Sequence, residues 1–331
     1  MYTICLGQFG NDQSITKTGT TVAQFLKIGM DARSTSMGGA VAGQNGNLSG
    51  VYWNPASIAS FNGIGVQFGS YDWLVAMKYQ FAIIGIDLGV KGVLGLSIVN
   101  LSSPDDLVRT VSEPQGTGEK FSTNDLSASL TYSKMLTDHF SLGGSFKYIQ
   151  QNIWHSTAHT VAIDIGTLFQ TPFYGTRLGA SISNYGGKMK MDGRDQKISI
   201  DPDLDNQGNV EFVNAIYETE HFPLPLFFRV GVSGELIKKQ NLKLSYGIDA
   251  LHPNDNTEHL NLGLELNYRE ILFLRGGIPS FYKMDSIEGP TFGAGLNYHM
   301  TRTATLLKID YSFSSYGPLG DVERLSIGFN F

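Results

Sequence analysis

The sequence contains no long hydrophobic run. Its 331 residues are 41% apolar, but charged or polar residues interrupt every candidate stretch. None approaches the roughly 18 to 20 consecutive apolar residues that a membrane-spanning helix needs. A helical membrane protein is therefore excluded, although the apolar content is sufficient for a folded protein.

Cysteine and charge are also scarce. The single Cys5 rules out an internal disulfide framework and a thiolate cluster for zinc or iron–sulfur binding. Charged residues make up 16% of the chain and the net charge is −6. Duplex binding depends on basic patches, so we expect no nucleic-acid partner. We also expect no cofactor.

Glycine and aromatic residues are plentiful, and a period-two pattern runs from about residue 62 to the end. The 39 glycines and 11% aromatics favour many short strands joined by turns. In the clearest segment, 260–269, leucines occupy most alternate positions, with polar residues or glycine between them. Such alternation indicates strands with one face toward an apolar medium and the other toward a wet one. About fourteen segments show it, near 62–71, 75–89, 92–102, 124–136, 139–151, 158–170, 174–185, 224–236, 240–250, 259–269, 271–278, 291–300, 303–314 and 321–331.

The connections between these segments alternate in length. Short links fall near 90–91, 137–138, 171–172, 238–239, 270 and 301, and long ones near 103–123, 186–223, 251–258 and 279–290. Short periplasmic turns opposite long external loops are typical of outer-membrane barrels. The sequence therefore predicts an all-β protein, a transmembrane antiparallel β-barrel of about fourteen strands in the cell outer membrane. A soluble sandwich with the leucine faces buried between two sheets is the competing fold.

The last segment alternates up to a terminal aromatic residue. Its apolar face carries Leu325, Ile327, Phe329 and Phe331. This ending resembles the signal by which the barrel assembly machinery recognises its substrates, so we expect that machinery and outer-membrane lipids among the partners. Outward aromatics near strand ends, namely Tyr132, Tyr148, Tyr268, Tyr298 and Phe331, fit girdles at the membrane interfaces.

The first sixty residues do not alternate and are too few for an independent domain. We interpret 1–20 as a flexible terminus or the remnant of a signal peptide, since a barrel must be exported. Lipidation at Cys5 fits poorly with the Tyr2-Thr3-Ile4 that precedes it. Residues 21–61 are predicted to be a hatch inside the barrel 62–331, because about fourteen strands enclose a lumen that strand side chains alone cannot fill. The hatch residues singled out are Arg33, Met37, Gly38, Gly39, Trp53, Asn54 and Pro55.

Two stretches of this N-terminal part carry a family resemblance. FLKIGMDARSTSMGGA at 25–40 and WNPASIA at 53–59 resemble the start of the PorV/PorQ family, which is itself similar to FadL-type outer-membrane transporters. FPLPLFFRVGVSG from Phe222, HPNDNTEHLNLGLEL from His252 and DYSFSSYGPLG from Asp310 extend the resemblance over most of the chain.

The resemblance implies a fourteen-stranded barrel with an N-terminal hatch and a non-catalytic role around the type IX secretion system of Bacteroidota. The implied partners are a secretion translocon, the C-terminal domains of cargo proteins and cell-surface attachment proteins. The chain is shorter than expected of PorV itself. The alternative function is that of a FadL-like transporter of hydrophobic small molecules.

The strand faces opposite the leucines carry charged residues that we expect to point into the lumen. A charge facing lipid costs roughly 2 to 4 kcal/mol at mid-membrane, and inside the barrel both signs can pair with each other and with Asp31 and Arg33. The charges are interpreted as a network that holds the plug, with a substrate path as the alternative. They are Lys147, Asp164, Arg229, Asp249, Glu265, Arg269, Lys308, Asp310 and Arg324.

No catalytic or metal motif stands out. The acidic run 201–206 departs from the EF-hand pattern at Asn206 and Phe212, so we interpret it as an external loop. His155 and His159 lack a third zinc ligand nearby in the sequence. Ser233 has glycines around it at the wrong spacing for a nucleophile elbow. The chain is therefore not expected to be an enzyme.

Overall fold

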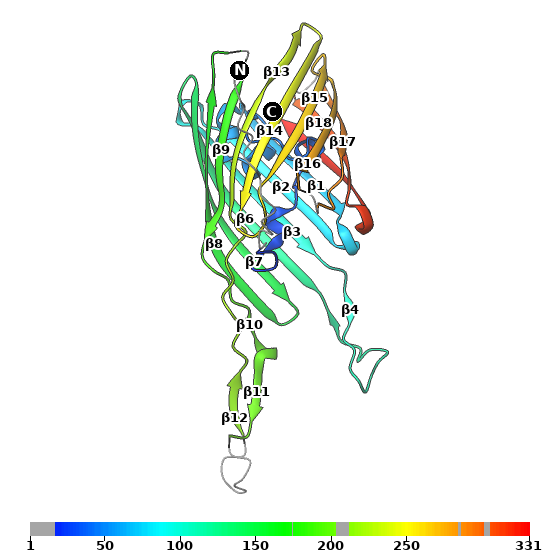
Figure 1. Cartoon of the computed structure of the whole chain (residues 1–331). Helices are drawn as coiled ribbons and strands as arrows, with labels where there is room; N and C mark the ends of the chain where they lie inside the picture. The colour runs from blue at the N-terminus through cyan, green and yellow to red at the C-terminus, as the bar shows by residue number, and fades with distance from the viewer. Residues whose placement is uncertain (1–16, 174, 203–211, 284–285, 301–304) are drawn as a thin grey trace, which may run out of the picture.

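The computed structural model describes residues 17–173, 175–202, 212–283, 286–300 and 305–331. Fourteen long strands close into an antiparallel barrel (Figure 1). They are β1 (Ile64–Asp72), β2 (Lys78–Asp87), β3 (Val93–Ser102), β6 (Thr123–Thr137), β7 (Phe140–Ile153), β8 (Ser156–Gln170), β9 (Arg177–Gly186), β13 (Phe227–Lys239), β14 (Leu242–Pro253), β15 (His259–Tyr268), β16 (Leu272–Phe281), β17 (Thr291–Met300), β18 (Thr305–Ser315) and β19 (Asp321–Asn330).

Each barrel strand pairs with its sequence neighbour, and β1 pairs with β19 to complete the ring. Three short extensions lie outside this pattern. β10 (Asp192–Gly193) adds to the edge of β8, while β4 (Asp106–Leu107) with β5 (Lys120–Phe121), and β11 (Lys197–Ile200) with β12 (Val213–Ile216), form separate two-stranded sheets. The predicted barrel is confirmed, and the predicted segments match its fourteen strands.

The two ends of the barrel differ in their connections. The long links, including those that carry β4–β5 and β10–β12, all leave from one end, which lies at the bottom of Figure 1. The links that close the other end, including η5 (Gly89–Lys91), are short. η4 (Leu74–Ala76), η6 (Arg194–Gln196) and η7 (Gly317–Leu319) belong to the long-loop end. We call the two ends the long-loop end and the short-turn end.

The barrel wall follows the sequence alternation. On β3, Leu94, Leu96 and Ile98 are exposed on the outside, whereas Val93 and Ser97 are buried inside. On β19, Leu325, Ile327 and Phe329 share the outer face, and Phe331 is 65% exposed just beyond the strand. The sandwich alternative is wrong, because a dry interface between two sheets would bury these residues.

Residues 21–63 run through the inside of the barrel, as the blue helices in Figure 1 show. This internal segment starts at the long-loop end, where the Val22 N–H donates to the Pro223 carbonyl at 3.0 Å. It passes η1 (Gln24–Lys27), α1 (Ala32–Ser36), η2 (Leu48–Tyr52) and η3 (Pro55–Ser60). It ends beside Phe331 at the short-turn end, where β1 begins. The segment therefore crosses the full depth of the lumen.

A ring of inward-facing glycines allows the backbone of the segment to touch the wall. A Cβ added at Gly277 would lie 2.1 Å from the Gly38 nitrogen, and one at Gly247 would lie 2.2 Å from the Ala40 carbonyl oxygen. Any side chain at these positions would displace the segment. The same kind of contact, with a Cβ within 3.0 Å of an atom of the segment, occurs on eight strands that follow one another around the barrel, at Gly143, Gly166, Gly179, Gly231, Gly247, Gly263, Gly277 and Gly293.

The apolar core lies between the segment and the strands β1 to β3. Met30, Leu48 and Ile58 of the segment pack in one cluster with Tyr79 and Ile83 of β2. All five side chains are at most 3% exposed. Among the described residues, no helix is long and apolar enough to cross a membrane.

Candidate lumenal binding site

A cavity of about 820 Å³ lies in the lumen at the long-loop end. Phe227 and Leu251 line it from the barrel wall, Trp73 and Ile287 from the loops, and Leu26 from the internal segment. Ligand pockets in proteins are commonly of this size, with apolar walls and a few polar groups. The cavity can therefore accept a small molecule with an apolar body.

The floor of the cavity is the middle of the internal segment, which an ion pair clamps to the wall. The Arg229 guanidinium lies 4.8 Å from the centre of the Trp53 ring and donates to the Gly39 carbonyl at 2.8 Å. Asp249 lies 3.3 Å from Arg229 and accepts the N–H groups of Val41 and Ala42, both at 2.9 Å. The pair thus fixes the backbone 39–42 and closes the floor.

A second buried ion pair stands in the cavity wall at the seam between β8 and β9. Lys147 lies 2.6 Å from Asp164 and donates to the Asn184 side-chain oxygen at 2.9 Å. The strand register shifts here, because two residues of β9, Ser183 and Asn184, stand opposite Asp164 alone. Asn184 adopts a φ of 63°, and its N–H donates to Asp164 at 2.8 Å. The seam therefore carries a β-bulge that borders the cavity.

At the rim, a loop carboxylate holds the start of the internal segment. One oxygen of Asp255 accepts hydrogen bonds from Thr21 at 2.5 Å and Gln24 at 3.1 Å, and Lys27 lies 2.5 Å from it. Burial alone would raise the pKa of Asp255, but the three donors and the Lys27 charge lower it below its ordinary value. This contact holds η1 against the loop 254–258 beside the cavity.

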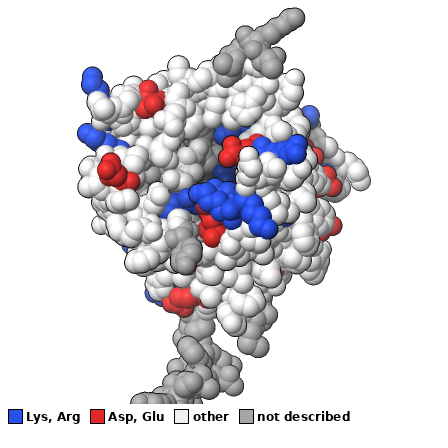
Figure 2. Space-filling model, turned by 90° about the horizontal axis from the view of Figure 1, so that it is seen from above, with Lys and Arg blue, Asp and Glu red and all other residues white. Residues whose placement is uncertain are grey.

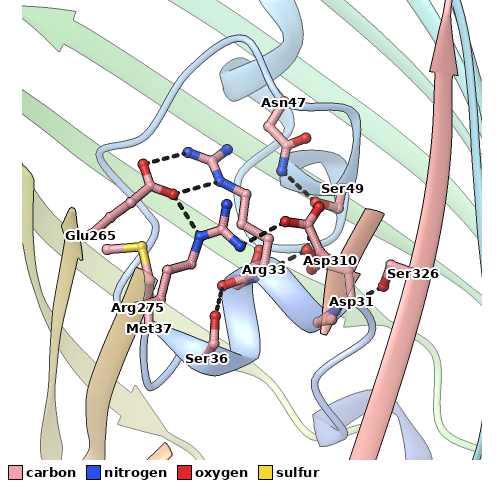
Figure 3. A network of polar contacts seen from close by, with 12 residues as sticks. Asp31, Arg33, Ser36, Met37, Asn47, Ser49, Glu265, Arg275, Asp310 and Ser326 are labelled. Atoms are coloured by element: carbon pink, nitrogen blue, oxygen red, sulfur yellow. Dashed lines mark hydrogen bonds and ion pairs between the residues drawn. The ribbon is translucent and has the colours of Figure 1, made fainter. Parts of the chain in front are cut away.

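Below the floor, a charged network joins α1 to three strands (Figure 3). Arg33 donates to both oxygens of Glu265, at 3.1 and 3.2 Å. Arg275 donates to Glu265 at 2.7 Å and to Asp310 at 2.6 Å. Asp31 caps α1 by accepting the Ser34 N–H at 3.0 Å. Since Glu265 bridges two cations, it ties the internal segment to the wall.

Arg324 differs from the other buried charges. Its guanidinium packs 4.8 Å from the Tyr71 ring centre and 5.3 Å from that of Trp73, and it donates to Ser314 and Tyr316. Among the described residues it has no carboxylate within ion-pair distance. Aromatic faces and hydroxyl groups therefore take the place of a counter-ion.

Not every residue expected in the lumenal charge network lies in it. Arg269 is exposed in the turn between β15 and β16 at a φ of 55°, because β15 ends at Tyr268 and the alternation does not extend into the turn. Lys308 faces the lumen, but among the described residues no hydrogen bond or ion pair reaches its amine. The other seven are buried in the separate groups described above.

Three charged residues of these groups escaped the sequence analysis: Arg275, Asp255 and Lys27. Arg275 faces Glu265 in the strand register, and its place in the alternation of β16 could have revealed it. Asp255 lies in a loop and Lys27 in the internal segment, where no periodic signal exists. The designated residues of the internal segment lie at its contacts with the wall and the cavity floor: Arg33, Met37, Gly38, Gly39, Trp53, Asn54 and Pro55.

The remaining sequence candidates do not form a site. His155 lies 2.9 Å from Asp195 in the loops, whereas His159 stacks on Tyr148 outside the barrel. Ser233 donates to the Gly43 carbonyl at 2.6 Å. Cys5 and most of the acidic run 201–206 lie outside the described residues. Within the described part of the chain, no three His, Cys, Asp or Glu side chains gather as a metal site.

Comparisons with known proteins relate this geometry to solved structures. No family model matches the chain, and no curated protein matches it. Several solved structures resemble it over nearly its whole length, and two of them serve as examples. A FadL homologue of Pseudomonas aeruginosa is 11% identical with a TM-score of 0.53, covering 95% of this chain and 99% of that one. The Pseudomonas putida toluene transporter TodX is 13% identical with a TM-score of 0.56, and the match covers 91% of this chain and 98% of that one.

The chain has the fold of a FadL-type barrel. At such low identity the likeness concerns the fold alone. Together with the apolar outer wall, this fold makes the chain a multi-pass β-barrel of the outer membrane. Membership of the PorV/PorQ family finds no support among these neighbours, which are transporter and channel barrels.

Proposed function

We propose that this barrel takes up apolar small molecules from the long-loop end and holds them in the lumenal cavity. The observation that carries the proposal is the apolar-lined cavity between the loops and the internal segment. The fold neighbour TodX is described as a toluene transporter and a monoaromatic hydrocarbon channel, which supports the same class of cargo.

In this proposal residues 21–61 act as a hatch that blocks a straight path through the lumen. The contacts of the segment with the glycine ring, and the clamp from Arg229 and Asp249, support a hatch that stays in place. A bound molecule would then leave sideways through the wall. The proposed exit is the β8–β9 seam, where the register shifts and where Ser183 and Asn184 line the cavity.

Binding can be tested through the tryptophans that line the cavity, Trp53 and Trp73. Purified barrel titrated with toluene or dodecanoate should show a saturable change in tryptophan fluorescence. Leu251→Gln places a polar group in the cavity and should weaken binding about tenfold. Leu319→Gln, in an exposed loop, is the matched control. Equal affinities of the two variants, or no binding of either probe, would contradict the proposal.

The exit can be tested separately with a disulfide across the seam. Ile165 and Ile182 are paired across it and face outward, so Ile165→Cys with Ile182→Cys should lock the seam under oxidation. We expect binding to persist while uptake of dodecanoate by cells falls until a reductant is added. The pair Ile248→Cys with Leu262→Cys, across β14 and β15, is the control. Unchanged uptake through the locked seam would exclude this route.

A second candidate is a PorV/PorQ-type role in protein secretion, and the external arm favours it. β11 and β12 form an isolated two-stranded sheet that extends from the long-loop end (Figure 1). Val213 and Ile216 are 43% and 61% exposed on it, and Tyr217, directly after β12, is 64% exposed. Isolated hairpins are marginally stable in water, so a protein partner covering this surface would stabilise the arm.

The proposed partners of the arm are a translocon, cargo C-terminal domains or surface attachment proteins. Crosslinking in intact cells, followed by extraction in mild detergent, should recover one of them with the native chain. Ile216→Ser with Tyr217→Ser should abolish the recovery, whereas Leu319→Ser should not. Equal recovery with both variants would argue against the arm. Recovery of barrel assembly proteins would instead indicate that the chain was captured during its assembly into the membrane, through the C-terminal strand β19.

A further inference from the structure

The barrel wall around the lumenal cavity contains a carboxylate that is not part of an ion pair. Asp125 lies on β6 near the long-loop end and faces inward, opposite Gln151 of β7 in the strand register. Gln151 donates to one oxygen of Asp125 at 2.9 Å, and both half-buried side chains line the cavity. Among the described residues, no Lys, Arg or His side chain lies within ion-pair distance of Asp125.

The internal segment fixes the orientation of these two side chains. The Ala23 N–H donates to the Gln151 Oε1 at 3.0 Å, which leaves the Nε2 of the same amide group to donate to the Asp125 Oδ2. The other oxygen of Asp125, Oδ1, accepts no hydrogen bond within the described part of the chain, and it is not sealed in the wall. The cavity therefore contains a fixed acceptor that a donor group of a ligand can reach.

The other charged groups that line the cavity do not occupy this acceptor. Lys283 and Glu288 have opposite charges and lie on the loop after β16, a strand half-way around the ring from β6. His259 donates to the Thr257 carbonyl at 3.2 Å. The three remaining cations each have a carboxylate of their own: Lys27 with Asp255 at 2.5 Å, Lys147 with Asp164 at 2.6 Å and Arg229 with Asp249 at 3.3 Å.

The charges at the short-turn end are separated from Asp125 by the internal segment. Figure 2, which looks onto this end, shows Lys and Arg side chains in the middle of the barrel opening with acidic side chains beside them. The backbone at Gly38 and Gly39 forms part of the cavity floor and stands between that opening and the cavity. Asp125 thus keeps an unpaired charge, which solvent screens less than it screens a surface charge.

We propose that Asp125 makes the cavity selective for apolar molecules that carry a hydrogen-bond donor, either an amine or a hydroxyl group. This inference rests on the proposed function and specifies the class of molecule that the cavity prefers. The apolar body contacts side chains such as Phe227 and Leu251, and the donor group binds the Oδ1 of Asp125. A hydrogen bond to an ionised acceptor is roughly twice as strong as one between neutral groups, and a pure hydrocarbon cannot make it. Gln151 is a positioning residue that holds the carboxylate.

Toluene, benzyl alcohol and benzylamine test this preference, because they share an aromatic ring and differ in the donor group. Titrations of the full chain in a nonionic detergent, followed by tryptophan fluorescence, should show both donor-bearing probes binding about tenfold more tightly than toluene. Asp125→Asn removes the charge and keeps the shape, so it should weaken benzylamine binding about tenfold and leave toluene binding unchanged. Asp72→Asn, on the exposed outer face of β1, is the matched control and should change neither affinity.

The three probes also separate this inference from the proposed function. If toluene binds the native chain and neither donor-bearing probe binds more tightly, the inference is wrong and the proposed function stands. If no probe binds, both are wrong. The inference is also wrong if Asp125→Asn weakens toluene binding as much as benzylamine binding, since the effect would then be structural. A loss confined to benzylamine would assign the site to ammonium groups, and a loss for both donors would include hydroxyl groups, so either result supports the site.

Discussion

The barrel wall and the internal segment are built on different principles. In the wall, each residue faces lipid or lumen according to its place in a period of two, so the environment of a side chain follows from its neighbours in sequence. The internal segment has no period, and contacts with residues more than a hundred positions away fix its path, such as those of Gly38 with β16 and of Ala40 with β14. A substitution in the wall should therefore have an effect that depends on which face of the strand it lies on. A substitution in the internal segment should have an effect that depends on the distant residue it contacts.

Removing the wall carboxylate that binds the internal segment should have the largest effect on stability. Glu265→Gln leaves Arg33 and Arg275 without the carboxylate that bridges them, and the loss of one member of a buried ion pair typically costs about 3 to 5 kcal/mol. We expect a matching fall in the free energy of unfolding, measured by urea denaturation in detergent. Glu323→Gln, on the outer face of β19, is the control. Equal stabilities of the two variants would show that the network does not hold the segment.

Placing a charge on the lipid-facing side of the wall should have a somewhat smaller effect on stability. Leu264→Arg puts a charge on the lipid side of β15, at a cost of roughly 2 to 4 kcal/mol near mid-membrane. The yield of folded barrel, measured as the heat-modifiable band on a gel, should drop. The same change at Leu319, in a loop, should be tolerated. Normal assembly of Leu264→Arg would contradict the assignment of this face to lipid.

Replacing one glycine of the ring with alanine should displace the internal segment but leave the barrel wall folded. Gly277→Ala forces the backbone at Gly38 to move, and overpacking of this kind costs about 1 to 3 kcal/mol. Hydrogen exchange at 36–43 should speed up. Gly328→Ala makes the same change inside the barrel where the nearest atom is 3.6 Å away, so it should have no such effect. If both variants exchange alike, the close contacts do not position the segment.

The rim contact should give the smallest effect and depend on pH. Because the pKa of Asp255 is below its ordinary value of 3.8 in the folded chain, its contribution is complete above that value and is lost as the pH falls through the lower one. Exchange protection of 21–27, corrected for the intrinsic rate, should therefore decrease in strong acid. Asp255→Asn should already have low protection at neutral pH and little further change. A native chain with constant protection would exclude the contact as a latch.

The alternation made the wall predictable down to its residues. The strand near 259–269 is β15 (His259–Tyr268), and the prediction failed only where β15 ends, at Arg269. The candidate site was harder to predict from the sequence. Lys147 and Asp164 could be assigned to the lumen because they lie on the polar side of their strands. Their hydrogen bonds with Asn184, however, depend on a β-bulge that no local sequence pattern predicts. Asp255 and the cavity had no sequence signal at all.

The sequence by itself determined that the chain forms a barrel with an apolar outside, because the alternation of side chains along a strand is a local property. Only the tertiary structure decided where the internal segment rests, which glycines receive it, and which end of the lumen remains hollow. Those features arise from contacts between distant parts of the chain. Their energies depend on distance and burial rather than on position in the sequence.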